Sequence, residues 1–103
     1  MTITTLSAAE MRAAIDAGAR LINICGTEEH ARERIGGAVN VPLARIGDLP
    51  RDNRPVVFHC RSGVRTAASS AQLAAAAGDA HTYILRGGID AWRGAGHAVV
   101  ADR

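Results

Sequence analysis

Residues 55–66, PVVFHCRSGVRT, join three kinds of segment within twelve positions. Residues 55–59 are apolar up to the histidine, which is typical of a strand in a parallel sheet that is covered on both faces. A polar loop that contains Gly63 follows. Residues 66–77 are rich in alanine and stop before Gly78, so they predict a helix. A strand, a short loop and a helix in this order form the repeating unit of parallel α/β sheets.

The rest of the chain alternates between strand and helix signals in the same way. Further strands are expected over residues 20–25, 38–41 and 81–85, which are short and mostly apolar. Helices are expected over residues 8–17, 28–33 and 89–94, and residues 43–54 are expected to form a loop with room for one helical turn. We therefore expect residues 1–103 to form a single α/β domain, with a mainly parallel sheet of about four to five strands and helices on both faces.

Two of the expected helices begin with capping signals. Ser7 and Glu10 have the spacing of a capping box, in which each side chain accepts a hydrogen bond from the backbone N–H of the other residue. Thr27 is predicted to be the N-cap of the second helix, because two acidic residues follow it and complement the helix dipole.

The composition excludes several classes of protein. The chain has 12 basic and 10 acidic side chains, for a net charge of +2, and every basic residue is an arginine. No apolar run approaches the roughly 18 residues of a membrane helix, and the N-terminus lacks the basic and apolar segments of a secretion signal. With 3% aromatic residues and no basic run, the chain carries no signal for nucleic-acid binding. We expect a cytoplasmic protein that binds neither membranes nor nucleic acids.

The two cysteines, Cys25 and Cys60, are too few for a disulfide framework and lack the spacing of a zinc site. Cys60 directly follows a predicted strand, and open parallel sheets bind ligands beyond the carboxyl ends of their strands. The amides of the following loop, the flexibility of Gly63 and the charges of Arg61 and Arg65 favour a thiolate over a thiol. Cys60 is therefore a candidate nucleophile. The alternative is a small buried residue that ends a strand.

Cysteine-dependent phosphatases also place a cysteine and an arginine before a helix. Four residues separate Cys60 from Arg65, one fewer than in a phosphatase loop of this general type. A smaller loop suits a sulfur atom better than a tetrahedral oxyanion. The spacing therefore disfavours a phosphatase or an arsenate reductase.

Three motifs resemble those of single-domain rhodaneses, a family of sulfurtransferases with a parallel α/β fold. They are CRSGVR at residues 60–65, GAVNVP at residues 37–42, and GGI at residues 87–89 followed by Ala91 and Trp92. The motifs occur in the family's order, and the resemblance runs from about Ser7 to Val99.

The resemblance implies a two-step sulfur transfer without a metal or an organic cofactor. Cys60 would attack a small anionic sulfur donor such as thiosulfate, become a persulfide, and pass the sulfur to a thiol, cyanide or protein acceptor. Arg61 and Arg65 are also expected to attract the donor. The loop residues whose backbone would bind the sulfur are Arg61, Ser62, Gly63, Val64 and Arg65. The alternative is a non-enzymatic persulfide carrier or interaction module of the same fold.

Two positions near the first short helix depart from the family's pattern. The preceding strand usually ends in Asp-x-Arg-x, whereas Asn23 and Cys25 stand here in place of the two charged residues. Because both charged residues are replaced together, neither one is left buried without its partner. We consider the hypothesis that Cys25 resolves the Cys60 persulfide or forms a reversible disulfide with Cys60, against the alternative of a small apolar replacement. His59 is expected to point away from Cys60, because adjacent strand residues face opposite sides of a sheet.

Overall fold

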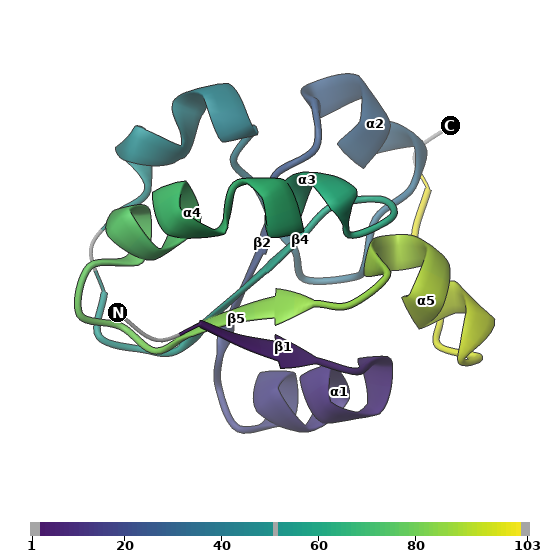
Figure 1. Ribbon diagram of the computed structural model, residues 1–103. Coiled ribbons are helices and arrows are strands. Elements are labelled where there is room, and N and C mark those ends of the chain that lie inside the picture. The colour runs from purple at the N-terminus through teal and green to yellow at the C-terminus, as the bar shows by residue number, and fades with distance from the viewer. Residues whose placement is uncertain (1–2, 51, 102–103) are drawn as a thin grey trace.

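The computed structural model of the protein describes residues 3–50 and 52–101. Within these residues, five parallel strands form one sheet in the order β1-β5-β4-β2-β3 (Figure 1). Their bounds are β1 (Ile3–Leu6), β2 (Arg20–Asn23), β3 (Val39–Asn40), β4 (Val56–His59) and β5 (Thr82–Leu85). The expected α/β fold with a parallel sheet is confirmed.

Helices cover both faces of the sheet, as expected (Figure 1). One face carries α1 (Ala8–Asp16) and α5 (Gly88–Gly94). The other face carries α2 (Thr27–Arg32), the 3-10 helix η1 (Leu43–Asp48), α3 (Val64–Ala68) and α4 (Ser70–Ala77). In the part of the chain that the structure describes, no helix is long and apolar enough to cross a membrane.

The central strand β4 contributes to two apolar cores, one on each face. Its side chains alternate between the faces, as the pleat of a strand requires. Phe58 packs with Leu73 of α4 and Ile46 of η1 on one face. Val57 packs with Met11 of α1 and Trp92 on the other face. All four residues of β4 are buried, which explains why its sequence is continuously apolar up to His59.

The capping prediction is confirmed for α1 and wrong for α2. At α1, the Ser7 hydroxyl accepts a hydrogen bond from the N–H of Glu10 at 3.2 Å, and the Glu10 carboxylate accepts one from the N–H of Ser7 at 2.9 Å. At α2, Gly26 is the N-cap and Thr27 is the first helical residue. The cause is Glu29, whose carboxylate reaches back to accept a hydrogen bond from the N–H of Gly26 at 3.2 Å.

Other boundaries also differ from those expected. The strand β1 was not predicted, and it pairs with β5 at one edge of the sheet. The strand β2 stops at Asn23, so Cys25 lies beyond it. The helix expected over residues 66–77 begins two residues earlier and is divided at Ser69 into α3 and α4. The loop expected over residues 43–54 contains the helix η1, and Arg51 within it lies outside the described residues, as do both ends of the expected domain.

Candidate functional site

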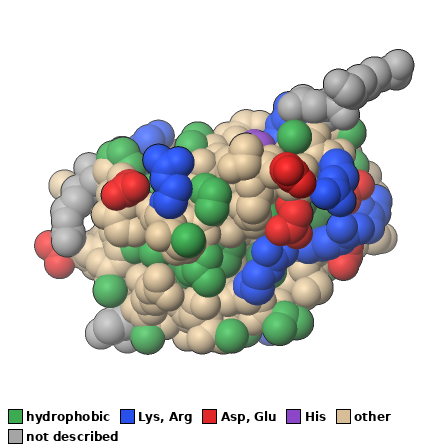
Figure 2. Space-filling model, turned by 90° about the horizontal axis from the view of Figure 1, so that it is seen from above, with side chains coloured by type: hydrophobic (Ala, Val, Ile, Leu, Met, Phe, Trp, Pro, Cys, Tyr) green, Lys and Arg blue, Asp and Glu red, His purple; other side chains and the backbone are tan. Residues whose placement is uncertain are grey.

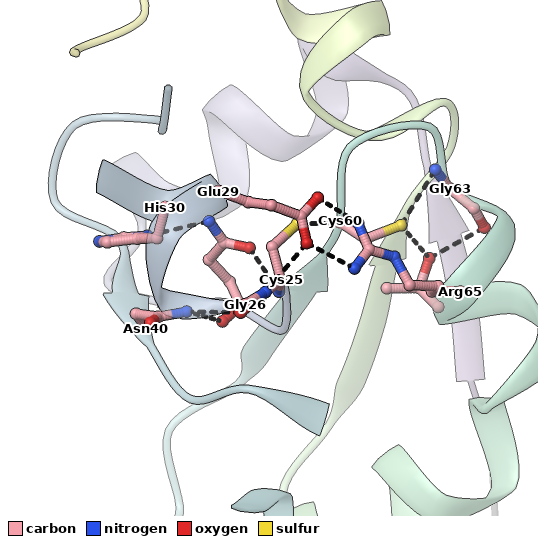
Figure 3. Close-up of polar contacts among 10 residues, drawn as sticks. Cys25, Gly26, Glu29, His30, Asn40, Cys60, Gly63 and Arg65 are labelled. Atoms are coloured by element: carbon pink, nitrogen blue, oxygen red, sulfur yellow. Dashed lines mark hydrogen bonds and ion pairs between the residues drawn. The ribbon is translucent and has the colours of Figure 1, made fainter. Parts of the chain in front are cut away.

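Cys60 lies directly after β4, between the carboxyl ends of β2 and β5. Its side chain is buried, with 1% of its surface exposed. The backbone N–H of Gly63 donates a hydrogen bond to the Cys60 sulfur at 3.1 Å, and the Thr66 hydroxyl oxygen lies 3.8 Å from the same sulfur (Figure 3). The loop therefore folds back over the thiol and directs a backbone donor at it.

Gly63 has the conformation that this loop needs. Its φ is +88°, a left-handed value that favours glycine, and it is the N-cap of α3. A Cβ at this position would lie 2.8 Å from the backbone nitrogen of Gly87. The predicted role of Gly63 in shaping the loop thus has two physical causes, a left-handed turn and a close approach of a second backbone segment.

The start of α5 holds the Cys60 loop from the other side. The N–H of Ile89 donates to the carbonyl of Cys60 at 3.0 Å, and the N–H of Asp90 donates to the carbonyl of Arg61 at 3.0 Å. A Cβ at Gly88 would lie 2.3 Å from the Cys60 carbonyl oxygen. The GGI motif therefore allows a close contact in which two loop carbonyls face α5.

Arg65 is held in an ion pair with a residue that the sequence analysis did not identify. Its two terminal nitrogens each lie 2.9 Å from a carboxylate oxygen of Glu29 on α2 (Figure 3). This contact lowers the pKa of Glu29 and raises that of Arg65. The charge of Arg65 is thus paired with a carboxylate, while 41% of the side chain stays exposed to solvent. The spacing of 36 residues between these partners left no local signal in the sequence.

Arg61 faces a cavity of about 330 Å³ beside the loop. The cavity is lined by Cys25, Glu29, Arg32, Glu33, Arg61 and Ile89. Basic and acidic side chains gather together at one end of this face of the molecule (Figure 2). A ligand in the cavity would therefore meet guanidinium groups and carboxylates together.

Ser62 and Val64 lie on a different side of the loop from Arg61. Together with Gly63 they border a larger groove of about 930 Å³, whose far wall comes from β1 and β5. Four of the five loop residues predicted to bind substrate are therefore divided between two hollows, and Arg65 lines neither of them. The amide of Gly63 is the one that the structure directs at the Cys60 sulfur.

The Asn23 side chain forms polar contacts with Cys25 and His30 at the end of β2. Its side-chain oxygen accepts a hydrogen bond from the N–H of Cys25 at 2.9 Å, and its side-chain nitrogen lies 2.9 Å from a ring nitrogen of His30. Asn40 of β3 donates to the carbonyl oxygens of Asn23 and Cys25 at 3.1 and 2.9 Å. The replacement of the family's charged pair therefore leaves a turn whose buried polar groups are hydrogen-bonded.

Cys25 itself lies against Arg65. A terminal nitrogen of Arg65 donates to the Cys25 sulfur at 3.4 Å. Burial raises the pKa of the Cys25 thiol to about 11, and the Arg65 guanidinium opposes this shift in part. Cys25 is therefore a protonated thiol at neutral pH.

The His59 side chain is fully buried at the end of β4. Neither of its ring nitrogens has a hydrogen-bond partner among the described residues. Burial lowers the pKa of His59 from 6.5 to about 4, so the ring is neutral at pH 7. In the same described part of the chain, no group of three His, Cys, Asp or Glu side chains is arranged to hold a metal ion.

Comparison with known proteins identifies the family. The sequence profile described as Rhodanese-like domain matches residues 7–95. The chain belongs to this family. The resemblance found in the sequence motifs is therefore confirmed.

This rhodanese-like domain is similar to several known proteins. A protein named Sulfurtransferase from Allochromatium vinosum is 36% identical over 85 residues, which cover 79% of this chain and 78% of that protein. A rhodanese-related protein from Thermoplasma volcanium has a TM-score of 0.79 at 24% identity, covering 94% of this chain and 97% of its own. A thiosulfate sulfurtransferase from Pseudomonas aeruginosa has a TM-score of 0.83 at 21% identity, covering 96% of this chain and 19% of its own. The two solved structures show the shared fold.

The contact between Gly88 and the Cys60 loop of this rhodanese-like domain leads to a first prediction. We expect Gly88→Ala to lower the free energy of unfolding by at least about 2 kcal/mol, because the added methyl group must displace loop backbone and strain a left-handed residue. Urea denaturation measures this change. Gly94→Ala, at the end of the same helix with open space around it, is the matched control and should be neutral or slightly stabilising. Equal effects of the two substitutions would contradict the assigned contact.

The burial of His59 leads to a prediction for the pH dependence of stability. The folded pKa of about 4 lies below the unfolded value near 6.5, so the folded state binds the proton less well. This contribution to stability is complete above pH 6.5 and is lost as the pH falls toward 4, by roughly 3 kcal/mol in total. Unfolding curves between pH 7 and pH 4 measure it. His59→Leu should flatten this part of the profile, whereas the exposed His81→Gln should leave it unchanged.

Proposed function

We propose that this rhodanese-like domain is a sulfurtransferase that carries sulfane sulfur as a persulfide on Cys60. The observation that carries the proposal is the hydrogen bond from the Gly63 amide to the Cys60 sulfur at 3.1 Å, at the carboxyl end of the central strand. The relative from Allochromatium vinosum, which is named Sulfurtransferase, supports the same activity. The short spacing between Cys60 and Arg65 favours sulfur over a phosphate group.

The first half of the proposed reaction loads Cys60. The Cys60 thiolate attacks the outer sulfur of thiosulfate, a new sulfur–sulfur bond forms, and the bond to the inner sulfur breaks. Sulfite leaves with the electron pair of that bond. The Gly63 amide, already directed at the site, stabilises the negative charge without rearranging during the reaction.

The second half of the reaction unloads Cys60. A cyanide ion or a thiolate of a small molecule or a protein attacks the outer sulfur of the persulfide, and the Cys60 thiolate leaves. The Gly63 amide that stabilised the persulfide then donates its hydrogen bond to the restored thiolate. No metal or organic cofactor takes part in either half. We place this activity in the cytoplasm, where free thiols stay reduced.

The two loop arginines are assigned different roles in this proposal. Arg61 lines the cavity beside the loop and attracts the anionic donor. Arg65, paired with Glu29, holds α2 against the loop and contributes less net charge to the cavity. The expectation that both side chains attract the donor is thus narrowed in this proposal to a main role for Arg61.

A persulfide carrier that serves a protein acceptor is the second candidate, and the burial of the thiol favours it. The Cys60 side chain is 1% exposed and lines neither of the two hollows beside the loop, so an acceptor does not reach the sulfur while the loop keeps this conformation. Such a carrier would accept sulfur from thiosulfate and release it slowly to free cyanide.

Removal of the Cys60 sulfur tests the proposed chemistry. We expect Cys60→Ser to lower thiosulfate:cyanide sulfur transfer, measured as thiocyanate, by at least about 1,000-fold, because the group that forms the covalent intermediate is lost. Intact mass measured immediately after treatment with thiosulfate should show the gain of one sulfur atom in the wild type and none in Cys60→Ser. Sulfur transfer that survives in Cys60→Ser would refute the proposal. Loading without release to cyanide would favour the carrier, and hydrolysis of an aryl phosphate at comparable rates would favour a phosphatase.

The role of Arg61 is tested by its effect on donor binding. We expect Arg61→Ala to raise the KM for thiosulfate by about fivefold and to change kcat little, since a partly solvated charge contributes about 1 kcal/mol to the binding of an anion. Steady-state kinetics at low ionic strength measure this change, and added salt should reduce the difference from the wild type. Arg12→Ala, on α1 and paired with Asp16, is the control and should leave the KM unchanged. An unchanged KM in Arg61→Ala would contradict the assignment.

A further inference from the structure

We propose that Cys25 is a resolving cysteine, which attacks the Cys60 persulfide, releases hydrosulfide and leaves a Cys25–Cys60 disulfide. This inference rests on the proposed function, because it requires a persulfide on Cys60. It adds a second outcome for the bound sulfur, namely reduction to hydrosulfide when no acceptor has taken it.

The strand register places the two cysteines close together. Asn23 of β2 lies opposite His59 of β4, and the N–H of Ile24 continues the ladder by donating to the His59 carbonyl at 2.9 Å. Continued beyond the strand ends, this register places Ile24 opposite Cys60, so Cys25 lies one residue past the position opposite Cys60. Both cysteines belong to the same buried cluster. Neighbouring strands lie about 4.8 Å apart, and disulfides join Cα atoms about 4.4–6.8 Å apart. With a rise of about 3.3 Å per residue, the one-residue offset corresponds to a Cα separation of about 6 Å, which is within the range of a disulfide.

Arg65 provides a positive charge that acts on both sulfurs. Its guanidinium donates to the Cys25 sulfur at 3.4 Å, and the charge of either thiolate would raise the pKa of Arg65 (Figure 3). Glu29 fixes the guanidinium in this position through two contacts of 2.9 Å. The guanidinium lies against the attacking Cys25 sulfur, where a fixed cation stabilises the negative charge that this sulfur gains as it loses its proton.

The step balances without an added oxidant. Cys25 enters as a thiol, because burial raises its pKa to about 11, and the Cys60 persulfide enters as an anion. A bond forms between the sulfur atoms of Cys25 and Cys60 while the bond from Cys60 to the outer sulfur breaks. The outer sulfur leaves with the electron pair, takes the Cys25 proton and becomes hydrosulfide. The outer sulfur is reduced and the two cysteines are oxidised to a disulfide.

The cavity beside the loop gives the next reductant a route to the disulfide. Cys25 and Arg61 both line it, so a reductant that enters past Arg61 meets the Cys25 sulfur. Hydrosulfide leaves from the side of the Cys60 sulfur opposite Cys25, in line with the bond that forms. Two molecules of a small thiol, or a protein dithiol, entering by the same route would reduce the disulfide and restore both thiols. Because Cys25 is protonated, we expect this resolution to be slower than transfer to a reactive acceptor such as cyanide.

The experiment follows the fate of one loaded sulfur. The wild type is treated with thiosulfate, freed of donor by gel filtration, and left without an acceptor. We expect release of one equivalent of hydrosulfide per loaded chain, the loss of both free thiols, and an intact mass lower than that of the reduced chain by two hydrogen atoms. Peptide mapping should find Cys25 joined to Cys60. Cys25→Ser should keep the added sulfur on Cys60 and release at least tenfold less hydrosulfide in the same time.

The outcomes separate this inference from the proposed function. A persulfide that persists in the wild type as long as in Cys25→Ser overturns the resolving role and leaves the proposed function intact. Sulfur found on Cys25 instead of a disulfide also overturns it. If neither protein gains sulfur from thiosulfate, the proposed function fails. Cys25→Ala provides a second variant should the serine hydroxyl disturb folding at this buried position, and Cys60→Ser should release no hydrosulfide.

Discussion

Two hydrogen bonds between α5 and the Cys60 loop constrain the whole site. The amides of Ile89 and Asp90 bind the carbonyls of Cys60 and Arg61, and this contact requires a residue without a side chain at Gly88. Because the carbonyls face α5, the chain that follows can fold back and direct the Gly63 amide at the sulfur. The chemistry proposed for Cys60 thus depends on a helix that follows it by nearly thirty residues and lies mostly on the opposite face of the sheet.

The second constraint is electrostatic and comes from α2. Glu29 caps that helix by binding the N–H of Gly26 and also holds the guanidinium of Arg65. One carboxylate thus connects the start of α2 with the start of α3. Cys25 stands in place of the arginine that is usual in the family at this strand end, and the guanidinium of Arg65 lies against the Cys25 sulfur. A cation is therefore present at this strand end even though the usual one is absent.

Local patterns in the sequence predicted the centre of the site better than its surroundings. The apolar run of β4, the glycine after Cys60 and the spacing to Arg65 are neighbours in the chain, so the sequence was sufficient to predict the loop. Glu29 and Gly88 act on that loop from distant positions, and their roles depend on tertiary contacts that local patterns do not encode. The missed strand β1 has a similar explanation, because two of its four residues are exposed and it gives a weak apolar signal. The division of α3 from α4 at Ser69 was also missed, because it falls within an alanine-rich run that has few features to indicate a break.

The edge strand β1 has a consequence for how the chain folds. Ile3 lies opposite Thr82 and Leu6 opposite Leu85, so the first strand of the sheet pairs with the last. Contacts between the two ends of a chain are slow to form, because a long loop must close before they contribute any stabilisation. During synthesis, β1 cannot pair with β5 until β5 has left the ribosome, because β5 is the last strand in the sequence. The strands β2 and β4 can pair with each other earlier. We therefore expect the pairing of β1 with β5 to follow that of β2 with β4.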